Sequence, residues 1–330
     1  MAMSSFQAWV IREQDGGFVR HLEEKTVSDL PDGDVLIRVA YSSLNYKDAL
    51  SATGNRGVTR HFPHTPGIDA AGEVVDSRAD AWKRGDRVLV TGYDLGMNTS
   101  GGFGQFIRVP AHWVIPLPDE LTPRESMIYG TAGFTAALSV FRLLEAGVRP
   151  DQGEILVTGA TGGVGSFAVG ILARVGFDVV AATGKLSERD YLLQLGAKEI
   201  VTRRDMTDET TKPILPGRWA GVVDTVGGDM LTTALKTTRY GGAITCCGLV
   251  ASADLQTTVF PFILRGLRLI GIDSVLCPQT LRQETWTRIA TDWKLHVLEQ
   301  IATDCPLREL SPQIDRILAG QVRGRVVVSL

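Results

Sequence analysis

The chain contains few cysteines, and they follow no metal-binding pattern. The four that occur in 330 residues are Cys246, Cys247, Cys277 and Cys305. No Cys-x-x-Cys pair is present, and no spacing between cysteine and histidine matches a structural zinc site. The adjacent pair lies in the apolar run AITCCGLV, where small apolar side chains of a buried strand account for it. The cysteines therefore give no indication of a structural metal.

The chain also lacks a charge excess and a long apolar segment. Its formal net charge is −3, whereas proteins that bind nucleic acids are usually basic. No stretch has the length of apolar sequence that a membrane-spanning helix needs. The start, MAMSSFQAWVIREQDGG, lacks the basic-then-apolar order of a signal peptide. We therefore expect a cytoplasmic protein that acts on a small molecule, with no nucleic-acid partner and no membrane.

The N-terminal third of the chain is typical of a β domain. Short runs rich in β-branched residues are separated by Gly, Pro and Asp turns, a pattern that indicates a barrel-like fold. These runs span 34–45, 70–75, 86–92 and 104–110. Helical periodicity replaces them over 124–147 and ends at Gly147.

A strand–helix alternation follows. Buried-strand candidates lie at 154–159, 178–184, 220–228, 241–249 and 268–274. Strands and helices that alternate at this spacing predict a parallel, doubly wound sheet. The tail, 324–330, resembles one more strand, and we expect it to return to the β domain because nothing else would cover its apolar face.

The length of the chain allows two cores. We predict an α/β protein in which 1–126 and 300–330 form a β-barrel catalytic domain. The inserted segment, 127–299, is then the dinucleotide-binding domain.

The strongest local signal is the turn after the first strand of the alternation. In EILVTGATGGVGS, Gly159, Gly162 and Gly165 are spaced three apart between a strand and a helix. One glycine can make the tight turn, one can let the backbone approach a pyrophosphate, and one can let helix pack on strand. The free N–H groups of the helix suit phosphates. The pattern predicts a dinucleotide site; the alternative is glycines that serve only a tight turn.

The end of the second strand bears on the choice of cofactor. An NAD enzyme usually has Asp or Glu there, which accepts a hydrogen bond from the ribose 2′-OH. Here the strand ends in Thr183-Gly184-Lys185, and Arg203 and Arg204 follow at the expected end of the third strand. These cationic groups suit a 2′-phosphate, so we predict NADPH. The alternative for Lys185 is a solvated surface lysine.

Six segments give the chain a family resemblance: SSLNYKDALSATG, FPHTPGIDAAGEVV, YGTAGFTAALSV, LVTGATGGVGS, VFPFILRG and LIGIDSV. With them the whole chain resembles the medium-chain dehydrogenase/reductase superfamily, and within it the zinc-free acryloyl-CoA reductase/quinone oxidoreductase subfamily of YhdH/YhfP type. The resemblance implies a GroES-like catalytic domain, an inserted Rossmann domain and an NADPH-dependent oxidoreductase.

The resemblance also implies cofactor contacts along the chain. The NADP contacts of the subfamily carry over to Tyr46, Thr161, Gly162, Gly163, Val164, Thr183, Gly184, Lys185 and Arg203. Those for the nicotinamide half carry over to Leu249, Ile263, Ser274 and Gln321. Arg325, in the tail, is a further candidate for the pyrophosphate, the alternative being a charge at the end of a strand.

Zinc members of the superfamily differ at two positions. They carry a cysteine ligand where this chain has Asn45, and Gly-His-Glu where it has Gly67-Ile68-Asp69. Asparagine and isoleucine are not zinc ligands at such a site. We therefore predict that the protein binds no metal, and that Asp48 and Asp69 fix loops by hydrogen bonds.

The chemistry we expect is hydride transfer to an activated double bond. Hydride adds at the β-carbon, and donors must stabilise the negative charge on the carbonyl oxygen. Asn45, Tyr46 and Lys47 are the donors that the resemblance places on the nicotinamide side. We interpret His61 and His64 as surface residues rather than as a proton relay.

Substrate choice is left between two classes of acceptor. The segment 91–102 lacks the tryptophans, glutamate and histidine that acryloyl-CoA reductases of this type carry there. A CoA ester would need a basic rim, which Lys47, Arg56, Arg60 and His61 could supply, the arginines being the best suited to phosphate. The alternative is that Arg56 and Arg60 are solvated loop charges. Quinone or enone reduction stays as the alternative, and a non-catalytic NADPH-binding protein as another.

The last strand candidate of the Rossmann domain suggests an assembly. The run RGLRLIGIDSV, 265–275, resembles a strand that often pairs with its own copy in this superfamily. An exposed apolar edge strand is a liability in a monomer. We therefore expect a homodimer.

Overall fold

The computed structural model describes residues 5–330 and divides into two compact units. The first unit comprises the chain up to Thr131 together with Val275–Ala290 and Ile301–Leu330. The second comprises Ala132–Ser274 and Thr291–Gln300. The segment 275–290, which the sequence analysis assigned to the dinucleotide domain, thus groups with the first unit.

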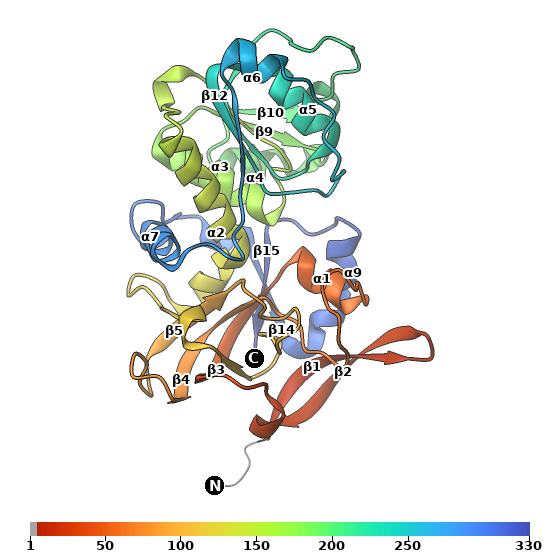
Figure 1. Cartoon of the computed structure of the whole chain (residues 1–330), viewed down its shortest axis with the longest axis vertical. Helices are drawn as coiled ribbons and strands as arrows, with labels where there is room; N and C mark the ends of the chain where they lie inside the picture. Colours follow the sequence, from red (N-terminus) through yellow and green to blue (C-terminus); the bar gives the residue numbers. More distant parts are fainter. Residues whose placement is uncertain (1–4) are drawn as a thin grey trace. The chain divides into compact units, whose positions relative to one another are not determined.

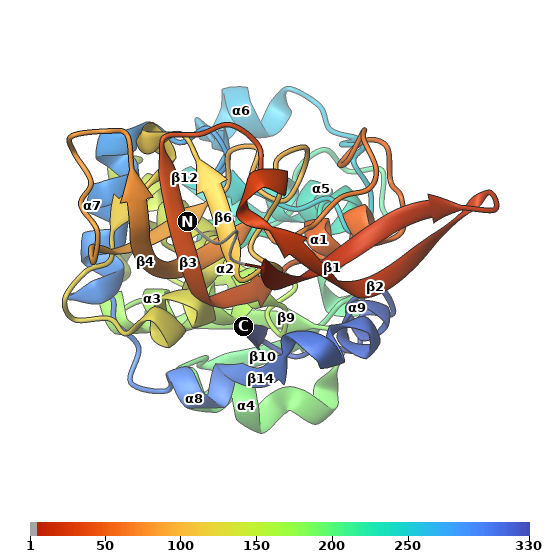
Figure 2. The ribbon, with the colours of Figure 1, turned by 90° about the horizontal axis from the view of Figure 1, so that it is seen from below.

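The first unit is built on a mostly antiparallel sheet. Its order is β14-β15-β3-β4-β5-β7, with β6 also paired to β3 (Figures 1 and 2). The strands are β3 (Val35–Leu44), β4 (Asp69–Ser77), β5 (Arg87–Thr91), β6 (Phe106–Val109), β7 (Ile115–Pro116), β14 (Ala302–Pro306) and β15 (Arg325–Ser329). Strand β15 runs antiparallel to β3. The predicted return of the tail to the β domain is therefore confirmed.

A long hairpin precedes this sheet, and the sequence analysis missed it. Strands β1 (Ser5–Gln14) and β2 (Gly17–Thr26) pair along their whole length, as Figure 2 shows. Asp15 and Gly16 form the two-residue turn, both with positive φ, which is the backbone that Asp-Gly favours in hairpins.

Three helices complete the first unit. Helix α1 (Tyr46–Ala52) packs against α9 (Leu310–Leu318), and both contribute to the apolar core beneath β15. Helix α7 (Gln279–Ala290) is held by Arg282, which is fully buried. The Arg282 guanidinium donates to the carbonyl oxygens of Thr91 and Val275, at 2.7 and 3.0 Å. These contacts explain why 275–290 belongs to this unit.

The second unit is a doubly wound parallel sheet. Its order is β10-β9-β8-β11-β12-β13, the 3-2-1-4-5-6 order of dinucleotide-binding folds. The strands are β8 (Ile155–Val157), β9 (Val179–Thr183), β10 (Glu199–Thr202), β11 (Trp219–Asp224), β12 (Thr238–Cys246) and β13 (Arg268–Gly271). In Figure 1 its strands lie between α3 (Gly163–Val175) and α5 (Gly228–Thr237). The unit also contains α4 (Arg189–Gln194), α6 (Phe260–Arg265) and all but the last residue of α8 (Leu298–Ile301). The predicted fold class is confirmed.

Helix α2 (Pro123–Glu145) is interrupted at Gly130, whose φ of 50° and ψ of −155° are not helical. The chain passes from the first unit to the second after Thr131, directly beyond this break. Within residues 5–330, α2 is the one helix long and apolar enough to cross a membrane, yet 78% of its apolar window is buried. Such burial is typical of a core helix.

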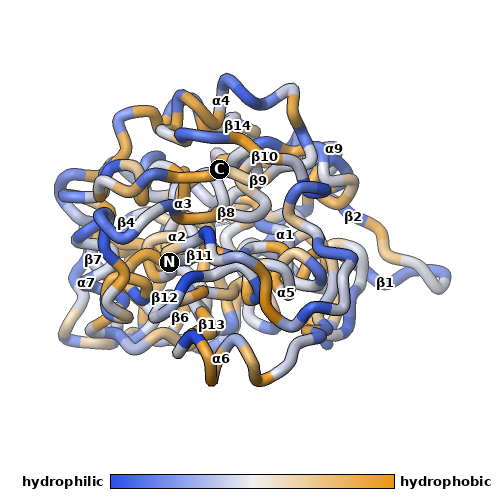
Figure 3. The backbone as a smooth tube through the Cα atoms, turned by 90° about the horizontal axis from the view of Figure 1, so that it is seen from above, coloured by the Kyte–Doolittle hydropathy of each residue, from blue (hydrophilic) through white to orange (hydrophobic). Residues whose placement is uncertain are grey.

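One surface of the second unit is apolar. Helix α6 exposes Phe260, Ile263 and Leu264, and Ile263 is 72% exposed. Figure 3 shows hydrophobic residues along this part of the backbone. Strand β13, which follows α6, is an edge strand of the sheet.

Candidate functional site

The glycine-rich turn joins β8 to α3. Gly159 has a φ of +60°, and a Cβ placed on it would lie 2.4 Å from Thr225 Oγ1. A Cβ on Gly165 would lie 2.3 Å from the Gly159 carbonyl oxygen, so α3 packs tightly on the turn. Gly162 is the N-cap residue of α3. The backbone N–H groups that begin this thirteen-residue helix form an anion-binding end.

The residues predicted for a 2′-phosphate come together at the ends of β9 and β10. A Cβ placed on Gly184 would lie 2.7 Å from Arg203 Nε, so the Arg203 side chain rests on this glycine. Thr183 Oγ1 accepts a hydrogen bond from the Lys185 backbone and lies 3.2 Å from Thr161 Oγ1 in the glycine-rich turn. Burial lowers the pKa of Lys185, and the Arg203 charge adds to that shift while Glu188 opposes it.

A buried carboxylate, which the sequence analysis missed, ties the turn to the centre of the sheet. Asp224, at the end of β11, accepts hydrogen bonds from Thr158 Oγ1 at 2.7 Å and from the Gly227 backbone at 2.9 Å. Burial raises its pKa, and these donors oppose the shift. β8 and β11 are the adjacent strands where the strand order reverses, which is where such folds bind ligands. The sequence signal that could have identified Asp224 was an acidic residue at the end of a buried strand.

The residues predicted for the nicotinamide half belong to both units. Leu249 lines a pocket of about 530 Å³ together with Cys246, Cys247 and the chain after β13. Ile263 lies on α6, and Ser274 is the last residue of the second unit before the chain leaves it. Gln321 follows α9 in the first unit, and its side chain is exposed. The structure does not bring these four into one pocket within either unit.

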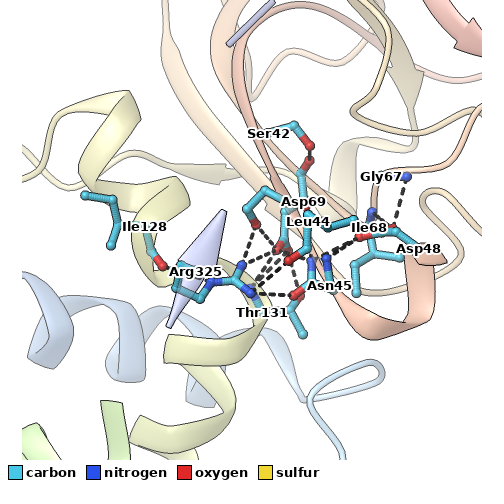
Figure 4. A network of polar contacts seen from close by, with 11 residues as sticks. Ser42, Leu44, Asn45, Asp48, Gly67, Ile68, Asp69, Ile128, Thr131 and Arg325 are labelled. Atoms are coloured by element: carbon cyan, nitrogen blue, oxygen red, sulfur yellow. Dashed lines mark hydrogen bonds and ion pairs between the residues drawn. The ribbon is translucent and has the colours of Figure 1, made fainter. Parts of the chain in front are cut away.

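A buried polar network occupies the first unit at the ends of β3 and β4 (Figure 4). Asp69 is its centre and is fully buried. Its carboxylate accepts hydrogen bonds from Asn45 Nδ2 at 2.8 Å, from Thr131 Oγ1 at 2.6 Å and from the Ser43 hydroxyl. The Arg325 guanidinium lies 3.6 Å from the same carboxylate. A Cβ on Gly130 would lie 2.5 Å from Asp69 Oδ2, so the break in α2 makes room for the network.

Two predicted site residues are enclosed by this network. Asn45 is 8% exposed and Arg325 is 3% exposed. The Asn45 amide donates a hydrogen bond from Nδ2 to the Asp69 carboxylate and accepts one at Oδ1 from the Arg325 guanidinium. Both side chains thus have their polar groups engaged inside the first unit, which argues against Asn45 as a donor to substrate and against Arg325 as a pyrophosphate ligand.

The other two predicted donors are placed differently. Tyr46 and Lys47 are the first residues of α1, and Tyr46 is 44% exposed. In the part of the chain that the structure describes, neither the Tyr46 hydroxyl nor the Lys47 ammonium has a hydrogen-bond partner. Both groups are therefore available to a ligand.

Asp48 fixes two loops, as the sequence analysis expected. Its Oδ1 accepts hydrogen bonds from the backbone N–H groups of Gly67 and Ile68, and its Oδ2 accepts one from the backbone of Asn45. Burial and the nearby Asp69 raise the pKa of Asp48 to about 7, and the N–H donors oppose that shift.

The predicted CoA rim is only partly available. Arg56 lies 2.6 Å from Glu13, donates to the Arg60 carbonyl oxygen, and stacks near the rings of Phe18 and Phe62. The Arg56 charge is therefore already paired with Glu13 of the β1–β2 hairpin. Arg60 is exposed, and among the described residues its guanidinium has no ion-pair partner.

One histidine departs from expectation. His61 is exposed, as predicted, but His64 is only 6% exposed. Its backbone pairs with Ile11, and Nε2 lies 2.8 Å from the Gly96 carbonyl oxygen. Burial lowers the pKa of His64. The interpretation of His64 as a surface residue is wrong, because β1 covers it.

Comparison with known proteins identifies the family. Residues 31–119 match the alcohol dehydrogenase GroES-like domain, and residues 163–291 match the zinc-binding dehydrogenase family. The acrylyl-CoA reductase AcuI of Ruegeria pomeroyi is 44% identical over 96% of this chain and 96% of its own length. The chain belongs to the medium-chain dehydrogenase/reductase superfamily. It is an oxidoreductase by this relationship, as predicted.

Two solved structures support the subfamily. The yhdH oxidoreductase of Salmonella enterica, in complex with NADP, is 44% identical with a TM-score of 0.95, covering 98% of this chain and 99% of that one. The Bacillus subtilis protein yhfP, with NAD bound, is 44% identical with a TM-score of 0.96, covering 99% and 100%. The predicted resemblance to the YhdH/YhfP type is confirmed.

Zinc does not fit the residues of this chain. The Asn45 amide is held between a carboxylate and a guanidinium, and Ile68 has no ligand atom. Arg325 places a positive charge beside Asp69, where it would repel a second cation. Among residues 5–330, no group of three or more His, Cys, Asp and Glu side chains could hold a metal ion. The absence of a metal stays a prediction.

Proposed function

We propose that the protein reduces an activated carbon–carbon double bond with NADPH, acting on an acryloyl-CoA-type 2-enoyl thioester without a metal. The observation that carries the proposal is the cationic site at the ends of β9 and β10, where Arg203 rests on Gly184 beside Thr183 and Lys185. Such a site suits a 2′-phosphate, and the Salmonella relative was solved with NADP.

The residues of the second unit fit NADPH. The turn residues Thr161, Gly162, Gly163 and Val164 would hold its pyrophosphate on the N-terminus of α3. Lys185 and Arg203 would hold the 2′-phosphate. When bound, NADPH supplies a hydride for the β-carbon of the substrate.

The residues of α1 carry the remaining task. Reduction also needs a proton at the α-carbon and donors to the carbonyl oxygen, on which negative charge develops. We assign the donors to Tyr46 and Lys47, because both have polar groups without a partner among the described residues.

The substrate class rests on the relative from Ruegeria, which is named an acrylyl-CoA reductase. NADPH oxidation should therefore be measured with acryloyl-CoA, a small enone and a quinone under the same conditions. Turnover of the CoA ester well above the other two supports the proposal. Brisk quinone reduction without acryloyl-CoA turnover favours the alternative, and tight NADPH binding without any turnover indicates a non-catalytic protein.

Arg60 should contribute to binding of the CoA ester. Arg60→Ala should raise KM for acryloyl-CoA about tenfold, the loss of one charge-assisted phosphate contact, and should spare a small enone. The effect should shrink as salt rises, because an exposed contact is screened. Arg56→Ala is the matched control: since Glu13 already pairs with Arg56, both substrates should respond equally. Equal losses for both substrates in Arg60→Ala would contradict the rim.

We also propose that the chain is a cytoplasmic homodimer. The exposed apolar residues of α6 precede β13 in the chain, and one edge of β13 is unpaired in the sheet of the second unit. Pairing β13 with its copy in a second subunit would cover that edge. Light scattering should give twice the chain mass of 35.7 kDa. Gly271→Pro, which removes an N–H from the side of β13 that faces away from β12, at a position where a Cβ meets nothing within 4 Å, should give the monomer. A wild-type mass of a single chain at micromolar protein would contradict the dimer.

A further inference from the structure

We infer that Asp224 is a positioning residue for the glycine-rich turn: it directs the Thr158 hydroxyl and so holds the turn in the shape that receives a pyrophosphate. The inference deepens the proposed function and rests on its NADPH site. Asp224 is fully buried at the end of β11, so it acts on the cofactor only through the residues around it.

The first step is the division of the Asp224 carboxylate between two elements. Oδ1 accepts a hydrogen bond from Thr158 Oγ1 at 2.7 Å. Oδ2 accepts one from the Gly227 backbone N–H at 2.9 Å, and the Cys246 thiol lies 3.9 Å from the same oxygen. Since Thr158 directly follows β8 and Gly227 is the N-cap residue of α5, Asp224 joins the residue before the turn to the start of α5.

The second step is the direction of the Thr158 hydroxyl. This hydroxyl has one proton, which it donates to Asp224, so its lone pairs are left for the Thr225 backbone N–H at 2.9 Å. The Thr225 hydroxyl in turn donates to the Thr158 carbonyl oxygen at 2.8 Å. The Thr158 backbone N–H donates to the Val223 carbonyl oxygen at 3.1 Å. Every polar group of Thr158 is thus bonded to the end of β11 or to the residue that follows it.

The third step leads from Thr158 to the turn. Gly159 is the next residue, and a Cβ placed on it would lie 2.4 Å from Thr225 Oγ1. The turn therefore packs directly against the two threonines that Asp224 orients. The Gly159 carbonyl oxygen accepts a hydrogen bond from the Gly162 N–H at 2.9 Å, and Gly162 is the N-cap residue of α3. A shift of the threonines would consequently move the N–H groups that would face the pyrophosphate.

The test replaces Asp224 by asparagine, which keeps the shape of the side chain but exchanges one acceptor for a donor. If the amide oxygen faces Thr158, the amide NH₂ faces the Gly227 N–H; if the amide is reversed, the Thr158 hydroxyl proton has no acceptor. Either orientation leaves a donor unpaired in a buried site.

Asp224→Asn should therefore raise the Kd of NADPH and the Kd of NADH by the same factor, about tenfold, which corresponds to the loss of one hydrogen bond to a charged group. The factor is shared because both cofactors carry the pyrophosphate. Fluorescence titration measures both constants. Unchanged constants for both cofactors would overturn the inference.

A fragment of the cofactor separates positioning from general stability. Adenosine 2′-monophosphate has the 2′-phosphate of NADPH but no pyrophosphate. Its Kd, from titration calorimetry, should stay within about twofold of wild type in Asp224→Asn, since its phosphate site is independent of the turn. An equal loss of affinity for this fragment and for NADPH would show that Asp224 serves only the fold of the second unit.

A second variant tests the route through Thr158. Thr158→Val keeps the shape of the side chain and removes the hydroxyl, and it should give the same loss of about tenfold for both dinucleotides. The double variant with Asp224→Asn should lose no more than either single variant, because both remove the same hydrogen bond. Losses that multiply in the double variant would contradict the route.

Thr238→Val is the matched control for Thr158→Val. Thr238 is also fully buried, and its hydroxyl donates to the Ala234 carbonyl oxygen at 2.7 Å. It begins β12, opposite Trp219 at the start of β11, whereas the turn lies beyond the end of β8. The Kd values of both dinucleotides should stay within about twofold of wild type. A tenfold rise in this control would show that any lost buried hydroxyl weakens binding, and would overturn the inference.

Turnover enters none of these measurements. If the wild type binds NADPH but oxidises it with none of the acceptors, the proposed function fails and the Kd comparison still decides the role of Asp224. If the wild type binds neither dinucleotide, the turn does not receive a pyrophosphate, and the inference fails as well.

Discussion

Replacing Lys185 and Arg203 together by alanine should weaken NADPH binding by about 100- to 10,000-fold and leave NADH binding almost unchanged. Each charge-assisted contact with a phosphate contributes about 1.5–3 kcal/mol to the binding free energy. NADH has no 2′-phosphate, so it makes no such contact and loses none in the variant. The charges of Lys185 and Arg203 interact with each other, so the contributions of the two residues need not add fully. Fluorescence titration of both cofactors against wild type and the double variant measures the ratio directly.

Arg204→Ala is the matched control for this prediction. Arg204 is exposed and adjacent in sequence, but it is Arg203 that lies against Gly184. Its removal should leave the ratio of NADPH to NADH affinity within about threefold of wild type. Equal affinities of the wild type for the two cofactors would contradict the phosphate site. That comparison matters, because the Bacillus relative was solved with NAD and the Salmonella relative with NADP.

The parts of the fold that local patterns encode were predicted from the sequence. The sequence segments of β8, β9, β11, β12 and β13 are short apolar runs with turns on both sides. Such a run by itself indicates a buried strand. The spacing of the glycines predicted the turn before α3 for the same reason. Glycine is needed there because a Cβ on Gly159 or Gly165 would clash with nearby atoms. The tail returned to the β domain because its apolar face had no other cover.

The parts that depend on distant partners were not predicted. His64 is buried because it pairs with Ile11, and Asn45 is engaged because Asp69 and Arg325 reach it. Nothing in the neighbourhood of Asn45 in the sequence distinguishes an amide that is free from one that is held at both ends. The segment 275–290 joined the first unit through the contacts of Arg282, which are equally remote from its own sequence context.

The hairpin β1–β2 shows a different kind of omission. Asp15-Gly16 is a strong local turn signal, and the strands on both sides pair in full register. Strand β2 is mostly exposed or half-buried, so its sequence lacks the alternation of apolar and polar residues that marks a half-buried strand. The turn could have been predicted from Asp15-Gly16. The flanking strands could not, because β2 lacks a regular pattern of apolar residues.

Lys47→Met should lower kcat about 100- to 1,000-fold, which is the cost of removing one donor to a developing oxyanion. Methionine keeps the length and apolar stem of lysine. Within the described residues the Lys47 ammonium has no hydrogen-bond or ion-pair partner, so the substitution removes no polar contact from the fold. Tyr46→Phe should lower kcat by about 100-fold on the same argument. Both kcat losses should be similar for acryloyl-CoA and a small enone, because the donors serve the carbonyl oxygen that the two substrates share.

Lys83→Met, at an exposed position of the same unit, is the control and should leave kcat unchanged. If Lys47→Met instead raises KM for acryloyl-CoA alone with kcat intact, then Lys47 belongs to the phosphate rim with Arg60 and Tyr46 is the donor to the carbonyl oxygen.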